Sequence, residues 1–366
     1  MSGTLLGNDL VINETDCNLS CAYCLTGQSN LKRSHREQLI FAPPQRGCYS
    51  ASTPLGQRID TVIERIATEF GTPLLKITGG EVFLVQNVLD LVEAAAQRFA
   101  SVVVQTNAAL LRPEHLRRLA QHSNVTLQIS LDSHLFEGNS FRVPRGDLHD
   151  KIIARIAAAI EAGLPLEVYA VVHSRSAQHL VAFAAWLDRF GTELRFLPFP
   201  VRGPDSAHFA CRPDQIGHVE ALAAAFERFA RILPPKAYLD RLVRFLHDGG
   251  RSARCHLPRL VVSSFSDGTI TACPNIWFSE LGNAAGDGWQ AALARVGRAP
   301  LYRALLAPRP RLAACRGCFT PWDLLSLYFD DDISLDELCA SPPYRPAAVR
   351  ERIAGIKAEH VAEHAA

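Results

Sequence analysis

The sequence predicts an α/β fold: a partial (β/α)6, TIM-like barrel followed by a small α+β region. Three observations support this prediction. Short β-branched runs alternate with amphipathic stretches over residues 10–200, these runs are apolar enough to be covered on both sides, and the alternation stops near residue 204. Six such units predict a parallel sheet that can form an open barrel. The expected strands are residues 9–13, 74–78, 101–106, 125–130, 166–172 and 193–199.

Amphipathic helices are expected between these strands. Apolar residues between positions 59 and 70 recur at the spacing that lines one face of a helix, and isoleucines between positions 152 and 160 repeat in the same way. Helices of this kind bury their apolar face against a parallel sheet. The pattern is therefore that of repeated βα units.

The C-terminal part of the chain has a different pattern. A polar, proline-bearing break at 204–215 is followed by helical patterns that extend to about residue 248. Residues 259–265 and 269–273 predict two strands joined by an Asp-Gly turn, since glycine adopts the positive φ that tight hairpins require. A charged helix ends the chain. The expected domains are the barrel at 1–205, a helical linker at 206–250, the α+β domain at 251–325 and a helical tail at 326–366.

Composition excludes several classes of partner. The chain has 366 residues, and 38 basic against 37 acidic side chains give a net charge of +1, so no overall field attracts nucleic acid or an anionic membrane. No apolar run approaches the roughly 18 to 20 residues of a membrane span, and the N-terminus lacks a signal-peptide pattern. The expected location is the cytoplasm. Ten cysteines there are expected to be reduced thiols that can ligate metal.

Three of these cysteines, Cys17, Cys21 and Cys24, lie within eight positions directly after the first expected strand. Ligands of parallel α/β folds bind at the carboxyl ends of strands, so the position suits a functional site. Cysteine thiolate is the usual ligand of iron–sulfur clusters, and three thiolates on a four-iron cluster leave one iron open. The alternatives are a zinc site or three buried thiols of no special role.

The segment CNLSCAYC, with spacings of three and two residues and an aromatic residue before the third cysteine, resembles the radical S-adenosylmethionine (SAM) superfamily. The resemblance implies that Cys17, Cys21 and Cys24 hold a [4Fe–4S] cluster whose open iron binds SAM. It also implies that Tyr23 lies near the adenine. In this family the cluster cleaves SAM reductively, and the resulting 5′-deoxyadenosyl radical removes a hydrogen atom from the substrate.

The ends of three further strands match segments that face SAM in this family. Gly79, Gly80 and Glu81 follow the second strand, where the glycines free the backbone to approach a ligand and Glu81 suits the methionyl ammonium; Val82 stands where the family commonly has proline. The other implied SAM contacts are Thr106 and Asn107 after the third strand, Ser130 and Asp132 after the fourth, and Arg142 or Arg145 for the SAM carboxylate.

A second set of cysteines occurs in the C-terminal part. Cys255 and Cys273 flank the expected hairpin, and Cys315 and Cys318 form a Cys-x-x-Cys pair. Taken alone, this set predicts a tetrathiolate zinc site. The spacing also resembles the SPASM and twitch extensions of radical SAM enzymes, which implies one auxiliary [4Fe–4S] cluster. Twitch fits better than SPASM, because no further cysteines follow at short spacing. Cys48, Cys211 and Cys339 are expected to be buried and inert.

The resulting expectation is a radical SAM oxidoreductase that oxidises or rearranges a small natural-product intermediate. The first strand begins near residue 9, which favours this substrate over a peptide, since peptide modifiers often carry a leader-binding domain before the barrel. The alternatives are a peptide-modifying enzyme that forms a thioether or carbon–carbon crosslink, a zinc protein without redox chemistry, and a degenerate member that binds SAM without cleaving it. Six arginines and no acidic residue occur between positions 289 and 322. They form either a solvated face or a docking site for an electron donor such as flavodoxin or ferredoxin, or for an anionic substrate.

Overall fold

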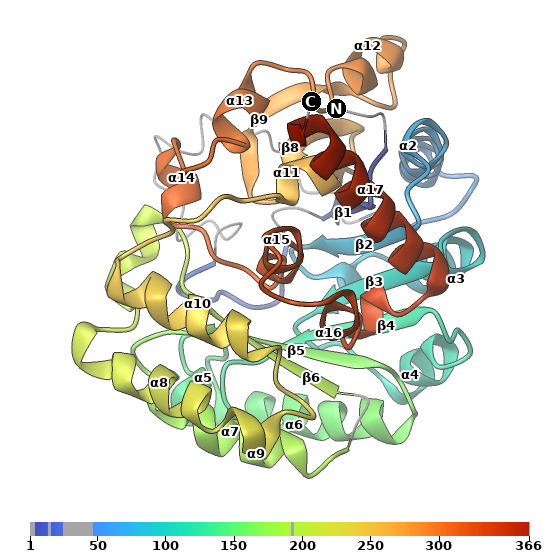
Figure 1. Cartoon of the computed structure of the whole chain (residues 1–366). Helices are drawn as coiled ribbons and strands as arrows, with labels where there is room; N and C mark the ends of the chain where they lie inside the picture. The colour runs from blue at the N-terminus through green and yellow to red at the C-terminus, as the bar shows by residue number, and fades with distance from the viewer. Residues whose placement is uncertain (1–3, 14–15, 25–46, 192–193, 366) are drawn as a thin grey trace.

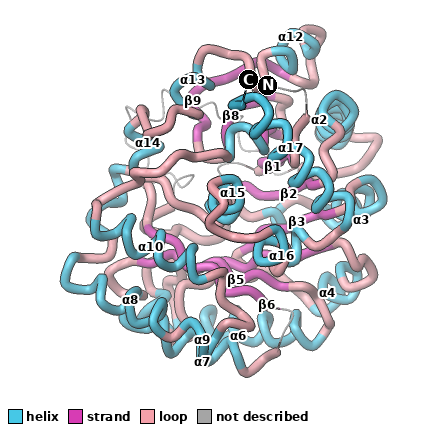
Figure 2. The backbone as a smooth tube through the Cα atoms, viewed as in Figure 1, coloured by secondary structure: helices cyan, strands magenta, loops and turns pink. Residues whose placement is uncertain are grey.

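A computed structural model describes residues 4–13, 16–24, 47–191 and 194–365. Its centre is one nine-stranded sheet with the strand order β6-β5-β4-β3-β2-β1-β7-β8-β9. The strands from β1 to β6 are parallel to one another, with a helical segment between consecutive strands (Figures 1 and 2). The predicted α/β class with a parallel sheet is confirmed.

The observed strands follow the predicted ones closely, with differences of at most two residues at an end; Glu193 of the predicted sixth strand lies outside the described residues. The strands are β1 (Gly7–Ile12), β2 (Leu74–Gly79), β3 (Ser101–Thr106), β4 (Val125–Ser130), β5 (Leu166–Val172), β6 (Leu194–Pro200), β7 (Val261–Phe265), β8 (Thr269–Cys273) and β9 (Ile276–Asn283).

Helix α2 shows how the sequence sets the helical boundaries. Thr53 caps its N-terminus by accepting a hydrogen bond from the Gly56 amide, and Pro54 occupies the first helical turn, where no amide partner is needed. Gly71 ends the helix with φ +59°. The apolar residues between 59 and 70 form its buried face, as predicted.

The helices between the strands are α2 (Pro54–Phe70), α3 (Val88–Arg98), α4 (Pro113–Leu119), α5 (Phe136–Asn139), α6 (Gly146–Glu161) and α7 (Leu180–Asp188). The later ones are α8 (Ile216–Ala224), α9 (Phe226–Phe229), α10 (Lys236–His247), α11 (Leu257–Leu260), α12 (Trp289–Ala294), α13 (Leu301–Leu305), α14 (Ala313–Arg316), α15 (Asp323–Phe329), α16 (Leu335–Leu338) and α17 (Ala347–Ala365). The 3₁₀ helices are η1 (Val82–Leu84), η2 (Ala177–His179), η3 (Pro204–Phe209), η4 (Pro213–Gln215) and η5 (Pro342–Tyr344).

The C-terminal hairpin extends the barrel sheet. β7 pairs in parallel with β1, and β8 and β9 continue the sheet in antiparallel fashion. Gly268 forms the predicted turn between β7 and β8 with φ +95°. The sequence analysis did not identify β9. The domain boundaries expected near residues 205 and 250 stay predictions, although hydrogen-bonded strands join the two regions.

The two faces of the sheet differ in polarity although both are buried. Asp9 of β1 and Lys76 of β2 are paired in the sheet and therefore share one face, whereas Leu10 and Ile77 share the other. The polar face meets the C-terminal part of the chain, because the Lys76 ammonium lies 5.5 Å from the ring centre of Trp322. No helix in the described part of the chain is long and apolar enough to cross a membrane.

Candidate active site

The three N-terminal cysteines lie on the loop that follows β1, at the edge where the parallel strands end. Cys17 is exposed, Cys24 is half-buried and Cys21 is buried, and the described segment 16–24 forms turns without a helix. The side-chain nitrogen of Asn107 lies 3.6 Å from Sγ of Cys17, and Sγ of Cys21 lies 3.8 Å from the carbonyl oxygen of Arg142. Residues that follow β3 and β4 therefore hold this loop.

Glu81 is fully buried two residues after β2. Its carboxylate accepts hydrogen bonds from Oγ1 of Thr106 at 2.7 Å, from the Asn107 amide at 2.9 Å and from the Phe83 amide at 3.1 Å. Burial raises the pKa of Glu81, and these donors oppose that rise. The side chain thus ties the end of β2 to the end of β3. Its contact with the methionyl ammonium of SAM stays a prediction.

Gly79 and Gly80 are packed against the chain that leads into the cysteine loop. A Cβ atom at Gly79 would lie 1.7 Å from the carbonyl oxygen of Ile12, and one at Gly80 would lie 2.1 Å from the carbonyl oxygen of Asp16. Gly79 also has φ +146°, which L-residues rarely adopt. The close approach that the sequence analysis expected toward a ligand is, in the structure, made toward the protein's own backbone.

We expect Gly79→Ala to lower the free energy of unfolding by about 2–5 kcal/mol, because both backbone strain and a steric clash act at this position. Urea denaturation of the metal-free protein measures the change. Gly146→Ala is the matched control, since no atom lies within 4 Å of its Cβ position and its φ is negative. Equal stability of the two variants would contradict the packing described here.

A buried ionic network lies beside the cysteine loop. Asp132 accepts hydrogen bonds from Arg142 at 3.1 and 3.3 Å, from the Val171 amide at 3.0 Å and from the Tyr23 hydroxyl, and Nε2 of His173 lies 3.3 Å from its Oδ2. Burial alone would raise the pKa of Asp132, but Arg142 and His173 outweigh this and hold it below its ordinary value. The Asp132 side chain is therefore a carboxylate at neutral pH.

The network changes the interpretation of several predicted SAM contacts. The Arg142 guanidinium is 9% exposed and lies 5.6 Å from the Tyr23 ring centre, so both side chains are bound within the protein. Arg145 is exposed and pairs with Asp147 at 2.5 Å. Ser130 is buried at the end of β4. Roles for these residues in binding the adenine, ribose or carboxylate of SAM stay predictions.

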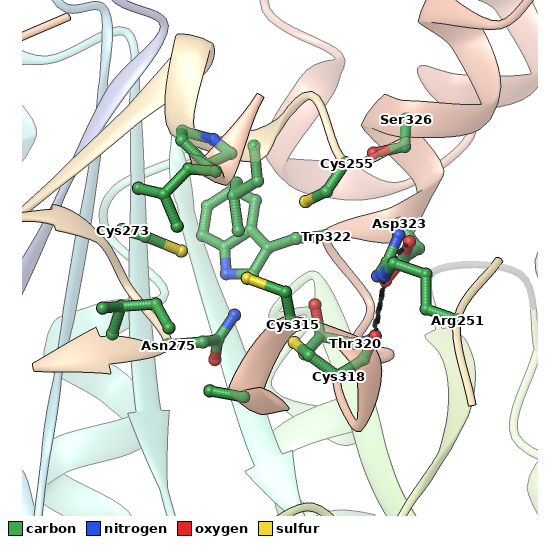
Figure 3. A pocket seen from close by; sticks show the side chains of 15 residues that line it. Arg251, Cys255, Cys273, Asn275, Cys315, Cys318, Thr320, Trp322, Asp323 and Ser326 are labelled. Atoms are coloured by element: carbon green, nitrogen blue, oxygen red, sulfur yellow. Dashed lines mark hydrogen bonds and ion pairs between the residues drawn. The ribbon is translucent and has the colours of Figure 1, made fainter. Parts of the chain in front are cut away.

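The second cysteine set lines one pocket, and its role as a ligand set stays a prediction. Cys255, Cys273, Cys315 and Cys318 come from three segments of the chain, and Figure 3 shows their sulfur atoms around the indole of Trp322. Burial raises the pKa of Cys255 to about 12 and that of Cys315 to about 11. Thiols held in this way are neutral until a metal displaces their protons.

Arg251 fixes the Cys315–Cys318 loop in place. Its guanidinium pairs with the Asp323 carboxylate at 2.6 Å and donates to the carbonyl oxygen of Cys318 at 2.8 Å. Its backbone amide donates to the carbonyl oxygen of Arg316 at 2.7 Å. Asp323 also accepts a hydrogen bond from the Thr320 amide at 2.8 Å. This buried pair therefore holds two of the four cysteines at the pocket.

The remaining cysteines lie outside both sets. Cys339 is buried as expected, whereas Cys48 and Cys211 are half-buried. Among the described residues, no three His, Cys, Asp or Glu side chains converge closely enough to hold a single metal ion.

Comparison with known proteins identifies the barrel. The family model of the radical SAM superfamily matches residues 15–187. This segment is a radical SAM domain. Such a domain binds SAM and a [4Fe–4S] cluster, and the three thiols at the carboxyl edge of the sheet have the donor chemistry that this cluster requires. The protein is therefore a radical SAM enzyme.

Relatives and solved structures extend the similarity beyond the radical SAM domain. The mycofactocin maturase MftC of Mycobacterium tuberculosis is 26% identical over 350 residues, which cover 92% of this chain and 83% of MftC. The GTP 3′,8-cyclase of Thermodesulfovibrio yellowstonii is 28% identical over 50% of this chain and 53% of its own length. SuiB of Streptococcus suis bound to SAM has a TM-score of 0.60 and 15% identity over 88% of this chain and 75% of SuiB.

Sequence reasoning missed several residues of these sites. His173 follows β5 and contacts Asp132, while Arg251 and Asp323 support the second cysteine pocket. A histidine directly after a predicted strand was the one signal that could have identified His173. The sequence carries no comparable signal for the Arg251–Asp323 pair, because these residues are far apart along the chain.

Proposed function

We propose that Cys17, Cys21 and Cys24 hold the [4Fe–4S] cluster of this radical SAM enzyme. The proposal is supported by the donor chemistry of three thiols on one loop and by the position of that loop at the carboxyl edge of the sheet. With SAM bound, a cluster held by these thiols would supply the electron for reductive cleavage of SAM and so allow hydrogen-atom abstraction from the substrate. The surrounding residues fix the loop, through Asn107 at Cys17 and the Arg142 carbonyl at Cys21.

Cys255, Cys273, Cys315 and Cys318 would hold one auxiliary [4Fe–4S] cluster. Four thiols that line a single pocket can ligate all four irons of a cluster and leave none open for substrate, so this site suits electron transfer or structural support. Zinc at the same four thiols is the second candidate by ligand type, although no three of these thiols converge closely enough in the structure to hold a single ion. The presence of a radical SAM domain in the same chain favours iron.

The substrate would be a peptide. The observation that carries this choice is the similarity to MftC, a maturase, over 92% of the chain, which includes the second cysteine set. Matched structures also include SuiB bound to the precursor peptide SuiA. The cyclase, whose name specifies a small molecule, matches only half of the chain. The comparisons thus favour the alternative substrate class over the small natural product expected from the sequence.

An acidic electron donor, such as flavodoxin or ferredoxin, would dock beside the auxiliary pocket. All six arginines between positions 289 and 322 are exposed, and none of them forms an ion pair with another described residue. A cationic surface attracts an acidic partner by charge complementarity. The arginines are Arg295, Arg298, Arg303, Arg309, Arg311 and Arg316.

Anaerobic reconstitution tests this function. We expect about eight irons per chain, and formation of 5′-deoxyadenosine from SAM after reduction with dithionite. Cys315→Ser should lower the iron content toward about four per chain and leave 5′-deoxyadenosine formation measurable, since the SAM-binding cluster is separate. With flavodoxin as the reductant, the rate should fall as salt rises. Stoichiometric zinc in the second pocket would mean that the four C-terminal thiols bind zinc and no auxiliary cluster. A protein that binds SAM without forming 5′-deoxyadenosine would contradict the proposed activity.

A further inference from the structure

Two opposite charges lie buried and unpartnered on the polar face of the barrel sheet. Asp9 is 4% exposed and Lys76 is 5% exposed. Oδ1 of Asp9 has no hydrogen-bond partner, and the Lys76 ammonium forms no ion pair or hydrogen bond with any residue that the structure describes. Asp9 and Lys76 are neighbours in the sheet and interact electrostatically, and Arg202 acts on both, but the two charged groups do not form an ion pair with each other.

Further polar groups share this face. Lys76 pairs with Val103 in the sheet, Val103 pairs with Thr126, and Gln128 lies two residues further along β4. Gln128 donates a hydrogen bond to Glu167 at 2.6 Å, but its own Oε1 is buried without a partner. This face therefore carries one donor group without a hydrogen-bond partner, the Lys76 ammonium. It also carries two acceptor atoms without a partner, Oδ1 of Asp9 and Oε1 of Gln128.

Aromatic rings cover the Lys76 ammonium. It lies 5.3 Å from the ring centre of Tyr169 and 5.5 Å from that of Trp322. Trp322 also lines the second cysteine pocket, where Figure 3 shows it among the four sulfur atoms. This group of buried polar residues thus lies in the barrel, next to the proposed auxiliary site and below the edge that carries Cys17, Cys21 and Cys24.

Buried charges without partners cost several kcal/mol each, so a fold that keeps them needs a compensating group. A substrate bound inside the barrel would be such a group. The charged groups that act on Lys76 are balanced, because the Asp9 and Glu167 carboxyl groups oppose Lys76 and Arg202, and Glu167 also accepts a hydrogen bond from Gln128. Burial raises the pKa of Asp9 to about 6 and that of Glu167 to about 7, which shows how strongly this face disfavours net charge. A bound group that is uncharged and both donates and accepts hydrogen bonds leaves the net charge on this face unchanged, whereas a bound carboxylate or ammonium changes it.

We propose that Asp9 and Lys76 bind an uncharged hydroxyl or amide group of the substrate, whose oxygen accepts from Lys76 and whose hydrogen is donated to Asp9. This inference rests on the proposed function, because it makes the barrel interior the substrate site. Tyr169 and Trp322 would then flank the bound group. The substrate class is narrowed to peptides that present an uncharged hydrogen-bonding group at the reacting residue.

Binding of small uncharged probes tests the inference. Saturation-transfer NMR on the SAM-loaded, cluster-containing protein would be measured with N-acetyl-L-serinamide and with N-acetyl-L-alaninamide. Binding of both probes assigns the amide, and binding of the serinamide alone assigns the hydroxyl. Lys76→Met and the isosteric Asp9→Asn should each raise the dissociation constant at least about tenfold, because each removes a hydrogen bond to a charged group. Lys236→Met, at an exposed helical ion pair, should leave it unchanged.

Three results would overturn the inference: no probe binding to the unchanged protein, displacement of a probe by acetate or methylammonium, or variants that bind as the unchanged protein does.

Thermal unfolding shows whether a variant loses binding because its fold is destabilised. The double variant Asp9→Asn, Lys76→Met should unfold at or above the temperature of the unchanged protein, whereas Arg251→Met, Asp323→Asn should unfold lower, because that buried pair is in contact. Iron content and 5′-deoxyadenosine formation of the unchanged protein test the proposed function separately, so a protein that passes both and binds no probe contradicts only this inference.

Discussion

Cys17→Ala is expected to abolish 5′-deoxyadenosine formation and to remove about four irons per chain, because a cluster held by three thiolates loses one third of its protein ligands. The same result is expected for Cys21→Ala and Cys24→Ala. The loss should be complete within assay sensitivity, since Cys48, the other described cysteine between β1 and α2, is expected to be inert. Iron analysis and chromatography of the quenched, dithionite-reduced reaction measure both quantities.

Cys48→Ala is the matched control for this result. Cys48 is half-buried and belongs to neither cysteine set, so its variant should keep full iron content and full activity. The assignment of Cys17, Cys21 and Cys24 as ligands is wrong if any of the three alanine variants retains the iron and the turnover of the unchanged protein.

Asp132→Ala is expected to destabilise the metal-free protein by about 3–5 kcal/mol, since it leaves the Arg142 guanidinium buried without its carboxylate. Urea unfolding gives the size of the effect. Asp147→Ala removes the partner of the exposed Arg145 instead and should cost no more than about 1 kcal/mol. A small effect of Asp132→Ala would mean that the network does not hold this part of the fold.

The pH dependence follows from the direction of the Asp132 shift. Its pKa is lower in the folded protein than in the unfolded chain, so its stabilising contribution is fully present above the unfolded value of about 3.9. The contribution is lost as the pH falls below that value through the lower, folded pKa. Asp132→Ala should therefore flatten the acid side of the stability profile, and urea titrations between about pH 5 and pH 2 would show it.

Regular periodicity made most of the fold predictable. The expected strands at 101–106, 125–130 and 166–172 agree with β3, β4 and β5, because β-branched runs between amphipathic helices leave few alternatives. β9 was missed for a physical reason. Its pairing with β8 shifts register twice, so its side chains lack the strict alternation by which strands are recognised.

Only residues whose spacing along the chain is typical of a ligand set could be predicted as parts of a site. Both cysteine sets could be found from their intervals, and the four C-terminal thiols do line one pocket. Asp9, Lys76 and Glu167 lie on three different strands, and no spacing in the sequence relates one of them to another. Their importance arises from neighbours that only the folded sheet provides.

The direct pairing of β7 with β1 has a further consequence for electron flow. β1 leads into the loop with Cys17, and the hairpin that begins at β7 carries Cys273, so a continuous ladder of backbone hydrogen bonds joins the strands next to the two cysteine sets. With clusters bound at both sets, as we propose, the tunnelling path between them would have a fixed length. Transfer of an electron from the substrate would then be controlled by driving force and not by movement of one region away from the other.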